Sequence, residues 1–393
     1  MDILQPIDSQ RIVSALRDTR NPNVWVYRFT HGVAGWILSI ATHAEPGSGK
    51  LSLGGFRIAP RERTEAPGFD PDKEAVNLAI GMEEKVHWSR VLNVGGPRAR
   101  RDMSRIVGGK CVLQPTAESR VGQPRDFEML DWAIQCFKEM ERESGVHLIT
   151  GQDLGHGMMS DGKTTSLKYL NADFTGSVVA DTSLPTAEGN YNVLKGMLAA
   201  FGIQPQSASV GLVGVGNIGK HICDRLRDDG ATVLAVESSP ARRNELTIGG
   251  IRVWDVVNKY EMLREPIDAL VVNAAGGTLD VDTITACVNN PRLKIVCGSE
   301  NLAMKDPEGA TRLLAAKKIY CPTELGGMMG YLTAVEEYLA VKEKLRFEVR
   351  QMMEASKRLE VVGRQASSLI KSRAYEITFE EAAEEIGREA SPV

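Results

Sequence analysis

The chain alternates short apolar stretches with longer segments whose apolar residues recur every three or four positions. Short apolar runs are typical of buried strands, and the longer spacing is typical of amphipathic helices. The pattern predicts strands near residues 24–27, 35–40, 109–113, 146–150, 208–213, 232–236, 269–272 and 294–297. It predicts helices over residues 72–90, 126–144, 187–198 and 220–229. This alternation indicates an α/β protein.

The same pattern divides the chain into three regions. Residues 1–182 are predicted to form an α/β domain of their own, and residues 183–335 a second one. Residues 336–393 have an almost wholly helical pattern, and we expect these helices to return to the first domain. A chain of 393 residues is long enough for two domains, each with its own core. Loops are expected at residues 44–50 and 60–72, which are rich in Pro and Gly.

A glycine-rich turn separates one predicted strand from the helix that follows it. A second strand then ends at Glu237, 23 residues after Gly214. Strand, glycine turn, helix, strand and acid, in this order, make a dinucleotide-binding unit. The first glycine makes the turn, the second admits the pyrophosphate, the third lets helix and strand pack, and the helix N-terminus faces the phosphates. The pattern predicts a Rossmann domain with cofactor contacts at Gly214, Gly216, Asn217, Ile218 and Gly219.

The acid at the end of the second strand favours NAD over NADP. A carboxylate there accepts hydrogen bonds from the ribose hydroxyls and repels a 2′-phosphate. Arg242 and Arg243 follow Glu237 closely and could in principle hold a phosphate. We interpret them as the solvated start of the next segment, so NAD is the expected cofactor and NADP the disfavoured alternative.

Composition and charge narrow the class of protein further. Hydrophobic residues make up 42% and charged residues 25%, as in ordinary soluble globular proteins. The net charge of −4 gives no reason to expect nucleic acid or a membrane surface as a partner. Residues 1–20 are polar and charged, unlike a signal peptide, and no apolar run approaches the roughly 18 residues of a membrane span. The six cysteines never form CxxC, which predicts buried thiols in a reducing cytoplasm, and no metal site is expected from the Cys or His spacing.

Several blocks between residues 25 and 339 follow one another in an order that chance would rarely produce. They are Leu53-Gly54-Gly55-Phe56-Arg57, Gly81-Met82-Glu83-Glu84-Lys85, Gly108-Gly109-Lys110-Cys111-Val112, Thr150-Gly151-Gln152-Asp153-Leu154-Gly155, Pro185-Thr186-Ala187-Glu188-Gly189, Ala274-Ala275-Gly276-Gly277 and Gly298-Ser299-Glu300-Asn301. This order resembles the glutamate/leucine/phenylalanine/valine dehydrogenase family, and is most similar to its leucine and phenylalanine branch. The resemblance implies a substrate and oligomerisation domain, then a Rossmann domain, in a homo-oligomer.

The resemblance also implies a reaction and the residues that carry it. The reaction is the reversible oxidation of an L-α-amino acid to its 2-oxo acid, with release of ammonia and NADH. Lys110 would activate water, Asp153 would move protons to and from the amino nitrogen, and Lys85 would hold the substrate carboxylate. The remaining residues implied are Gly54 and Gly55 on the substrate side, Thr186 and Ala274 on the cofactor side, and Asn301 on both.

One position bears on the substrate side chain. Leu53, just before the glycine pair, stands where the glutamate enzymes of the family carry a lysine for the side-chain carboxylate. An apolar residue there indicates an apolar or aromatic amino acid as substrate.

The spacing between the two lysines departs from the family. Lys85 and Lys110 are 25 residues apart, whereas the family usually has about a dozen residues between them. An ungapped alignment would put Pro97 at the catalytic lysine, which is chemically impossible. We prefer Lys110, because the apolar residues 111–113 follow it as a strand should. Residues 93–104 then form an insertion whose arginines, together with the adjacent Arg105, either make a solvated loop or meet an acidic substrate group; those within it are Arg98, Arg100 and Arg101.

Two further departures lie close to other family blocks. His156 stands where the family usually has a hydroxyl residue, and it would either add an acid–base group or face solvent. Gly327 falls where the family has an asparagine, so a substrate or cofactor contact would be missing. These departures keep two alternatives open: a specialised biosynthetic enzyme that reduces or condenses a 2-oxo acid or imine, and a noncatalytic NAD-binding protein.

Overall fold

The computed structural model describes residues 23–390, and the chain divides into two compact units. Helices α2 (Pro71–Leu92) and α13 (Met328–Lys342) each belong partly to both units. Residues 1–20, for which no signal peptide was predicted, lie outside the described residues. Unit 1 contains the described residues up to His87, together with Pro97–Thr182 and Tyr331–Glu348. Unit 2 contains Trp88–Gly96, Ser183–Gly330 and the described residues from Val349 onward.

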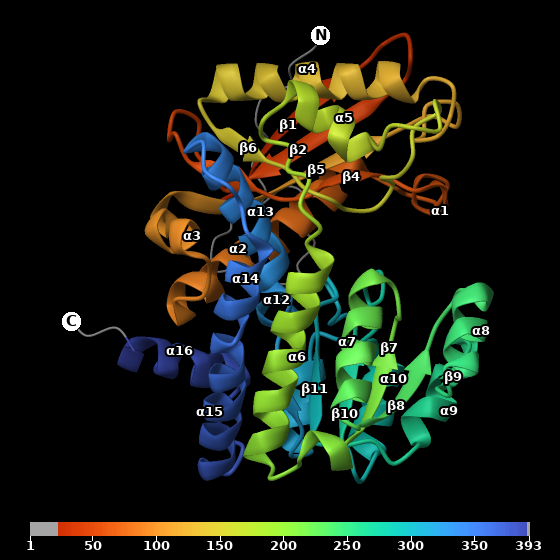
Figure 1. The fold of residues 1–393 in the computed structure, drawn as a ribbon, viewed down its shortest axis with the longest axis vertical. Coiled ribbons are helices and arrows are strands. Elements are labelled where there is room, and N and C mark those ends of the chain that lie inside the picture. Colours follow the sequence, from red (N-terminus) through yellow and green to blue (C-terminus); the bar gives the residue numbers. More distant parts are fainter. Residues whose placement is uncertain (1–22, 391–393) are drawn as a thin grey trace. The chain divides into compact units, whose positions relative to one another are not determined.

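Unit 1 is built on a mixed sheet of six strands (Figure 1). The strands are β1 (Trp25–Thr30), β2 (Ile37–Thr42), β3 (Leu51–Leu53), β4 (Phe56–Ile58), β5 (Ile106–Gln114) and β6 (His147–Ile149). The order is β1-β2-β5-β3-β6, with β4 also paired to β5. β5 runs antiparallel to β2 and parallel to both β3 and β4. The two short strands β3 and β4, which the apolar pattern did not predict, place the Gly54-Gly55 pair beside β5.

Helix α4 (Asp126–Ser144), predicted over the same residues, covers one face of this sheet. Its buried Met129, Ala133 and Phe137 recur every four residues and pack in one apolar core with sheet residues such as Phe56. The Phe56 and Phe137 rings meet edge to face, with centroids 5.1 Å apart. Unit 1 also contains the shorter helices α5 (Ser166–Asp173) and α1 (Arg61–Thr64). The single turn of α1 falls inside residues 60–72, which were predicted as loop.

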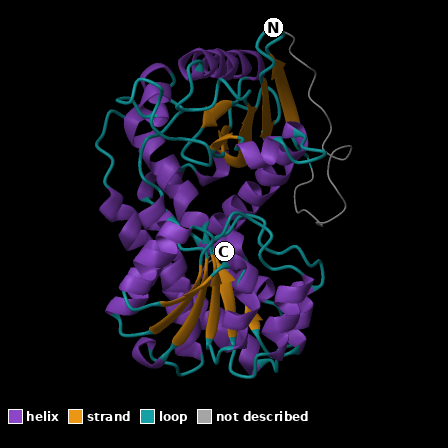
Figure 2. Cartoon of the chain, turned by 90° about the vertical axis from the view of Figure 1, so that its right-hand side faces the viewer, coloured by secondary structure: helices purple, strands orange, loops and turns teal. Residues whose placement is uncertain are grey.

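Unit 2 is built on a parallel sheet of six strands in the order β12-β11-β10-β7-β8-β9. The strands are β7 (Ser209–Val213), β8 (Thr232–Val236), β9 (Arg252–Trp254), β10 (Ala269–Val272), β11 (Ile295–Gly298) and β12 (Ile319–Tyr320). Counted from β7 as the first strand, this is the 3-2-1-4-5-6 order of the dinucleotide-binding fold. Figure 2 shows helices on both sides of this sheet, which explains why strands such as β10 are apolar throughout.

The helices of unit 2 mostly connect these strands. Those that precede α13 are α6 (Ser183–Ala200), α7 (Asn217–Asp228), α8 (Pro240–Ile248), α9 (Lys259–Arg264), α10 (Val281–Asn289), α11 (Gly309–Ala315) and α12 (Thr323–Gly326), with 3₁₀ turns at Pro205–Ser207 and Val256–Asn258. α6 comes before the first strand, and α7 starts in the glycine-rich turn between β7 and β8. No helix among residues 23–390 is long and apolar enough to cross a membrane.

The C-terminal helices divide between the units, unlike the predicted return of residues 336–393 to the first domain. The part of α13 after Gly330 belongs to unit 1, but α14 (Val349–Ser356), α15 (Arg358–Ser372) and α16 (Phe379–Ala390) belong to unit 2. Helices α15 and α6 lie side by side (Figure 1). A Cβ on Gly196 of α6 would stand 2.0 Å from the Glu360 carbonyl oxygen, and one on Gly363 of α15 would stand 2.4 Å from that of Val193. Small residues on both helices therefore bring the two backbones together, a match that helical periodicity alone does not reveal.

Candidate active site

Lys110 and Asp153 form a buried ion pair in unit 1. Lys110 lies in the middle of β5, and its Nζ contacts Oδ2 of Asp153 in the segment after β6. Their side chains are 4% and 12% exposed. The segment carrying Asp153 runs along β4, because the N–H of Phe56 donates to Gly151 O at 3.0 Å and that of Ile58 to Leu154 O at 3.0 Å. Since β4 also pairs with β5, the backbone brings together two side chains that are 43 residues apart in the sequence.

The glycine pair lies directly against this ion pair. A Cβ on Gly54 would overlap the carbonyl oxygen of Gly109, at 1.8 Å. A Cβ on Gly55 would stand 3.1 Å from Nζ of Lys110 and 3.2 Å from Cβ of Asp153. A side chain at Gly54 would displace β5, and one at Gly55 would cover the ammonium group of Lys110. Glycine at both positions therefore lets the turn lie against β5.

Arg57 is a further member of this cluster, and the sequence analysis assigned it no role. Its Nε and Nη2 donate to Asp153 Oδ2 and Oδ1 at 3.2 and 3.3 Å. Its Nη1 donates to Glu74 Oε1 at 2.6 Å, and its side chain is 4% exposed. Alternation along an extended segment puts Arg57 on the same side as Gly55, two positions earlier. That spacing was the available signal for including it.

The charges of this cluster shift the pKa values of its members. Burial alone would raise the pKa of Asp153, but the charges of Lys110 and Arg57 outweigh it and hold the pKa well below the usual range of a carboxyl group. Burial lowers the pKa of Lys110; the charge of Asp153 opposes this shift, and the charge of Arg57 adds to it. The site therefore holds an ionised carboxylate next to a lysine that loses its proton more readily than usual.

Lys85 and Leu53 lie close to the start of β5. Helix α2 packs there, since a Cβ on Gly108 would stand 2.3 Å from the backbone nitrogen of Glu83. The Glu83 carboxylate accepts a hydrogen bond from the N–H of Gly108 at 2.6 Å. Lys85, two positions further along α2, is 7% exposed. Leu53 pairs with Gly108 across the sheet and is 2% exposed.

In unit 2 the predicted glycine turn joins β7 to α7. Gly214 has φ of +85°, and its Cβ would stand 2.8 Å from the backbone nitrogen of Ala274. A Cβ on Gly219 would stand 2.1 Å from the carbonyl oxygen of Gly214. Around Gly216, by contrast, no atom lies within 4 Å of a Cβ position, and this residue caps α7 without a side-chain hydrogen bond. The first turn of α7, with Asn217 and Ile218, therefore presents backbone N–H groups in a cradle that fits the pyrophosphate of a dinucleotide.

Glu237 fastens the glycine turn from the end of β8. Its Oε2 accepts a hydrogen bond from the N–H of Val215 at 2.8 Å, and its Oε1 accepts one from the N–H of Ser239 at 2.8 Å. Arg243, predicted to be solvated, donates to the carbonyl oxygens of Glu237 and Ser238 at 2.8 and 2.6 Å. It also pairs with Asp255 at 2.8 Å, so its guanidinium group is engaged by its own chain.

The turns after β10 and β11 are tied to each other. The Glu300 carboxylate accepts hydrogen bonds from the N–H groups of Ala274 at 3.0 Å and Thr278 at 2.8 Å. Ala274 and Asn301 thus lie on two connected turns at the carboxyl edge of the parallel sheet. Thr186, in α6, is 5% exposed. The predicted cofactor residues other than Thr186 therefore gather where the carboxyl ends of neighbouring parallel strands meet.

Comparison with known proteins agrees with this arrangement. No protein-family model matches the chain. Over 292 residues, 73% of each chain, it is 28% identical to valine dehydrogenase of Streptomyces virginiae. It is 24% identical to leucine dehydrogenase of Bacillus subtilis over 293 residues, 73% of this chain and 71% of the relative. The structure of L-tryptophan dehydrogenase from Nostoc punctiforme superposes with a TM-score of 0.61 at 18% identity, covering 92% of this chain and 94% of that one.

The chain is similar to amino-acid dehydrogenases in sequence and in fold, which supports the family that its residue blocks indicate. It is an oxidoreductase, and the family implies a nicotinamide cofactor. The two-unit α/β fold is shared with solved glutamate dehydrogenases, among them the hetero-hexameric enzyme from Thermus thermophilus, with a TM-score of 0.63 at 16% identity over 90% of this chain and 83% of that one. Within residues 23–390, no group of three or more His, Cys, Asp or Glu side chains could hold a metal ion.

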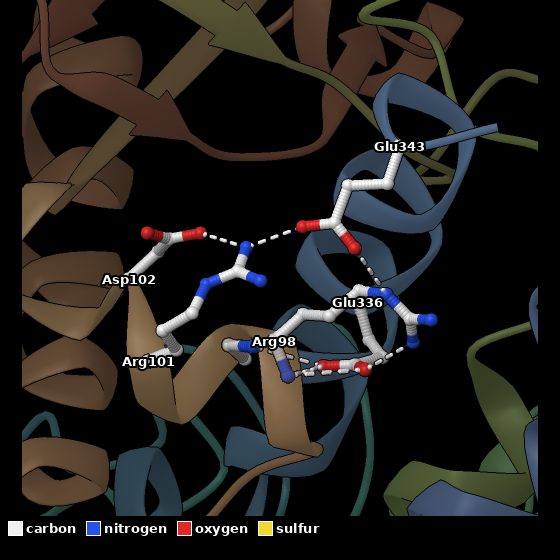
Figure 3. A network of polar contacts seen from close by, with 6 residues as sticks. Arg98, Arg101, Asp102, Glu336 and Glu343 are labelled. Carbon is white, nitrogen blue, oxygen red and sulfur yellow. Dashed lines mark hydrogen bonds and ion pairs between the residues drawn. The ribbon is translucent and has the colours of Figure 1, made fainter. Parts of the chain in front are cut away.

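The insertion of this dehydrogenase is ordered and is not a solvated loop. Residues 93–104 contain helix α3 (Pro97–Arg101) and lead into a 3₁₀ turn (Met103–Arg105). The fully buried carboxylate of Glu336, on α13, accepts hydrogen bonds from Ala99 N at 2.9 Å, Arg98 N at 3.1 Å and Arg98 Nη1 at 3.0 Å (Figure 3). Glu343 pairs with Arg98 at 3.0 Å and with Arg101 (Figure 3). The solvated-loop prediction is therefore wrong for Arg98, whose side chain is 15% exposed, whereas Arg100, Arg101 and Arg105 are exposed.

His156 of the dehydrogenase is half-buried, and both of its ring nitrogens have partners. Nδ1 lies 2.9 Å from Ser166 Oγ, and Nε2 lies 2.7 Å from the carbonyl oxygen of Phe56. Burial lowers the pKa of the imidazole. The ring thus ties the segment after Asp153 to β4, which is neither of the two roles expected from the sequence.

Gly327 lies between α12 and α13. A Cβ there would stand 3.0 Å from the carbonyl oxygen of Thr323 and 3.2 Å from that of Ser299. An asparagine at this position would need its neighbours to shift, so the local backbone explains the absence of a side chain.

Proposed function

We propose that this dehydrogenase catalyses the reversible, NAD-dependent oxidative deamination of an apolar or aromatic L-amino acid to its 2-oxo acid. The observation that carries this proposal is the buried Lys110–Asp153 ion pair beneath the Gly54-Gly55 turn. An acid–base pair shielded from bulk water suits a reaction that must move protons to and from nitrogen and oxygen at one carbon.

Each residue has a distinct task in the proposed reaction. A bound nicotinamide would accept the hydride from Cα of the substrate. Lys110, when neutral, takes a proton from the water that adds to the resulting iminium carbon, and as an ammonium it stabilises the developing oxygen charge. Asp153 transfers protons to and from the amino nitrogen. Lys85 holds the substrate carboxylate, which orients Cα for hydride transfer.

The substrate class rests on Leu53 and on the relatives. An apolar side chain at this position offers no charge partner to an acidic substrate. The names of the relatives, valine, leucine and tryptophan dehydrogenase, support the same class.

The choice of NAD rests on Glu237 and Arg243. Oε2 of the Glu237 carboxylate keeps a lone pair for a ribose hydroxyl beside the bond it accepts from Val215, whereas Oε1 accepts bonds from both Ser238 and Ser239. Arg243 is held by two carbonyl oxygens and Asp255, which leaves it poorly suited to bind a 2′-phosphate. We also propose a homo-oligomer, from the family resemblance alone.

The test measures NADH formation at alkaline pH with a panel of the twenty amino acids. The parent, Lys110→Ala and the control Lys138→Ala, an exposed lysine of α4, are compared. We expect turnover with Leu, Val, Phe or Trp, a loss of at least about 100-fold in Lys110→Ala, and no loss in the control. Turnover that survives in Lys110→Ala would remove the catalytic role from this lysine. If no amino acid in the panel is turned over but the protein still binds NAD, the specialised or the noncatalytic alternative would instead be favoured.

A further inference from the structure

Arg57 holds Asp153 with a two-pronged contact. Asp153 Oδ2 contacts both Arg57 Nε and Lys110 Nζ. Oδ1 accepts hydrogen bonds from Arg57 Nη2 at 3.3 Å and from the N–H of Leu154 at 2.7 Å. The parallel N–H donors of a guanidinium group fix the plane of the carboxylate as well as its position. Asp153 therefore cannot rotate without breaking several bonds.

Glu74 in turn fixes the guanidinium group. Its Oε1 lies 2.6 Å from Arg57 Nη1, and its side chain is 11% exposed. Four charged side chains thus come together from four segments: Lys110 from β5, Asp153 from the segment after β6, Arg57 from β4 and Glu74 from α2. The positive and negative charges in this set are balanced.

We propose that Arg57 is a positioning residue of this active site, which holds the Asp153 carboxylate in one orientation and offsets its negative charge at Lys110. The inference rests on the proposed function, because it assigns Arg57 to the same proton-transfer pair. A carboxylate beside a lysine, acting alone, would stabilise the ammonium form and keep Lys110 protonated. The fixed positive charge of Arg57 works against that stabilisation, so Lys110 becomes available as a base while Asp153 stays ionised.

Among the neighbouring charges, those of Asp153 and Arg57 act most strongly on the pKa of Lys110. Burial raises the pKa of the Cys111 thiol to about 12 and lowers that of His156, so both are neutral near pH 8. The Glu83 carboxylate is bonded to the backbone of Gly108, and Arg63 lies 3.8 Å from Glu74 on a side chain that is 41% exposed. Cys111 and His156 interact with members of the pair, and Glu74 pairs with Arg57 and lies 3.8 Å from Arg63. The other charged groups on the same helix as Glu74 and close to the start of β5 are Glu83 and Lys85.

The first test is the pH dependence of kcat/KM for amino-acid oxidation. In Arg57→Met, the pH at which activity rises should move upward by about one unit, a shift of the size a neighbouring charge produces, with about a 10-fold loss at pH 8 that recovers at higher pH. Arg57→Lys retains the charge and should keep the parent profile with a lower kcat. The control Arg61→Met removes an arginine whose side chain is 72% exposed and pairs with Glu65. This change should leave the pH profile as it is in the parent. A loss that is equal at every pH in Arg57→Met would reduce Arg57 to a structural role and overturn the proposal.

A second readout does not depend on turnover. The rate at which an amine-reactive reagent labels Lys110 is followed against pH by peptide mass spectrometry, in the parent and in Arg57→Met. Labelling should begin at higher pH in the variant, and identical titrations would overturn the inference. If the parent turns over no amino acid but Lys110 still titrates differently in the two proteins, the proposed function has failed and the role of Arg57 in the charge balance has not.

Glu74→Gln covers the case in which Arg57→Met does not fold. This change removes the carboxylate that partly offsets Arg57, so the positive charge acts more strongly on Lys110. The rise in activity and the onset of labelling should both move to lower pH. No movement, or movement to higher pH, would contradict the proposal.

Discussion

Gly55 lies against the ammonium group of Lys110, so that a Cβ on Gly55 would stand 3.1 Å from Nζ. The same Cβ would stand 3.3 Å from the carbonyl oxygen of Gln152. One added methyl group would therefore press on the lysine and on the backbone next to Asp153, with little room to relax.

Gly55→Ala should lower kcat/KM by about 100-fold, because a displacement of the catalytic groups by a fraction of an ångström is costly in rate. The fold should persist, since the backbone at this position is not left-handed and the contact is to one flexible side chain and to neighbouring chain atoms. Steady-state kinetics and a thermal unfolding curve measure the two effects. Gly32→Ala, where no atom lies within 4 Å of the new Cβ, is the control. Parental kinetics in Gly55→Ala would mean that the ammonium does not need this space.

Glu336→Ala should destabilise the protein by about 3 kcal/mol, because it leaves the N–H groups of Arg98 and Ala99 and a guanidinium group without their buried carboxylate. Glu343→Ala should destabilise the protein much less, since that carboxylate is 31% exposed and water screens its ion pairs. Urea unfolding of both variants measures the difference. Equal midpoints would show that burial of Glu336 adds nothing to the anchoring of α3.

Burial of His43 predicts that the protein loses part of its folding stability in acid. It is 4% exposed, and burial, opposed in part by backbone contacts at Ala79 and Asn23, lowers its pKa from 6.5 to about 4. The pKa of His43 is lower in the folded protein than in the unfolded chain. The contribution of neutral His43 to the free energy of unfolding is therefore complete above pH 6.5. It decreases as the pH falls towards 4, by about 3 kcal/mol in total. His43→Leu should flatten this part of the pH dependence in urea unfolding between pH 7 and 4. The control His147→Leu, at an exposed position of β6, should leave the slope of the parent.

Glu237→Ser should weaken NAD binding by about 10-fold or more, because a charged acceptor of hydrogen bonds is lost. NADP should lose less, or gain, since the repulsion of its 2′-phosphate is removed as well. Titration calorimetry with both cofactors gives the ratio of affinities. Glu245→Gln, at an exposed carboxylate of α8 that pairs with Arg242 at 3.5 Å, is the matched control. An unchanged NAD to NADP ratio in Glu237→Ser would transfer the choice of cofactor to another group.

Local patterns were sufficient to predict the strand, glycine turn and helix at the start of the sheet of unit 2. Strands β7, β8 and β10 are continuous apolar runs because helices cover both faces of the parallel sheet, and this made them visible in the sequence. The three glycines of the turn between β7 and α7 lie within six residues of the sequence, although Gly214 also packs against Ala274. The spacing of Gly214, Gly216 and Gly219 therefore carried the prediction by itself.

Contacts between distant parts of the chain were beyond such patterns. Lys110 and Asp153 were found only through a family resemblance, and Arg57 was missed because its partner Asp153 is 96 residues away. Strands β3, β4, β9 and β12 have two or three residues each, too few to show a period. The arginines of the insertion had no visible partner nearby, since Glu336 lies 238 positions after Arg98.

The late position of Glu336 in the chain has a consequence for biosynthesis. A ribosome that adds roughly 5–20 residues per second needs on the order of 10–50 s to pass from Arg98 to Glu336. Throughout that interval α3 emerges without the carboxylate that caps it, while the whole parallel sheet of unit 2 is being translated. Unit 1, although it comes first in the sequence, is therefore completed only after the whole sheet of unit 2 has been translated, and a nascent chain released before Tyr331 would lack part of both units.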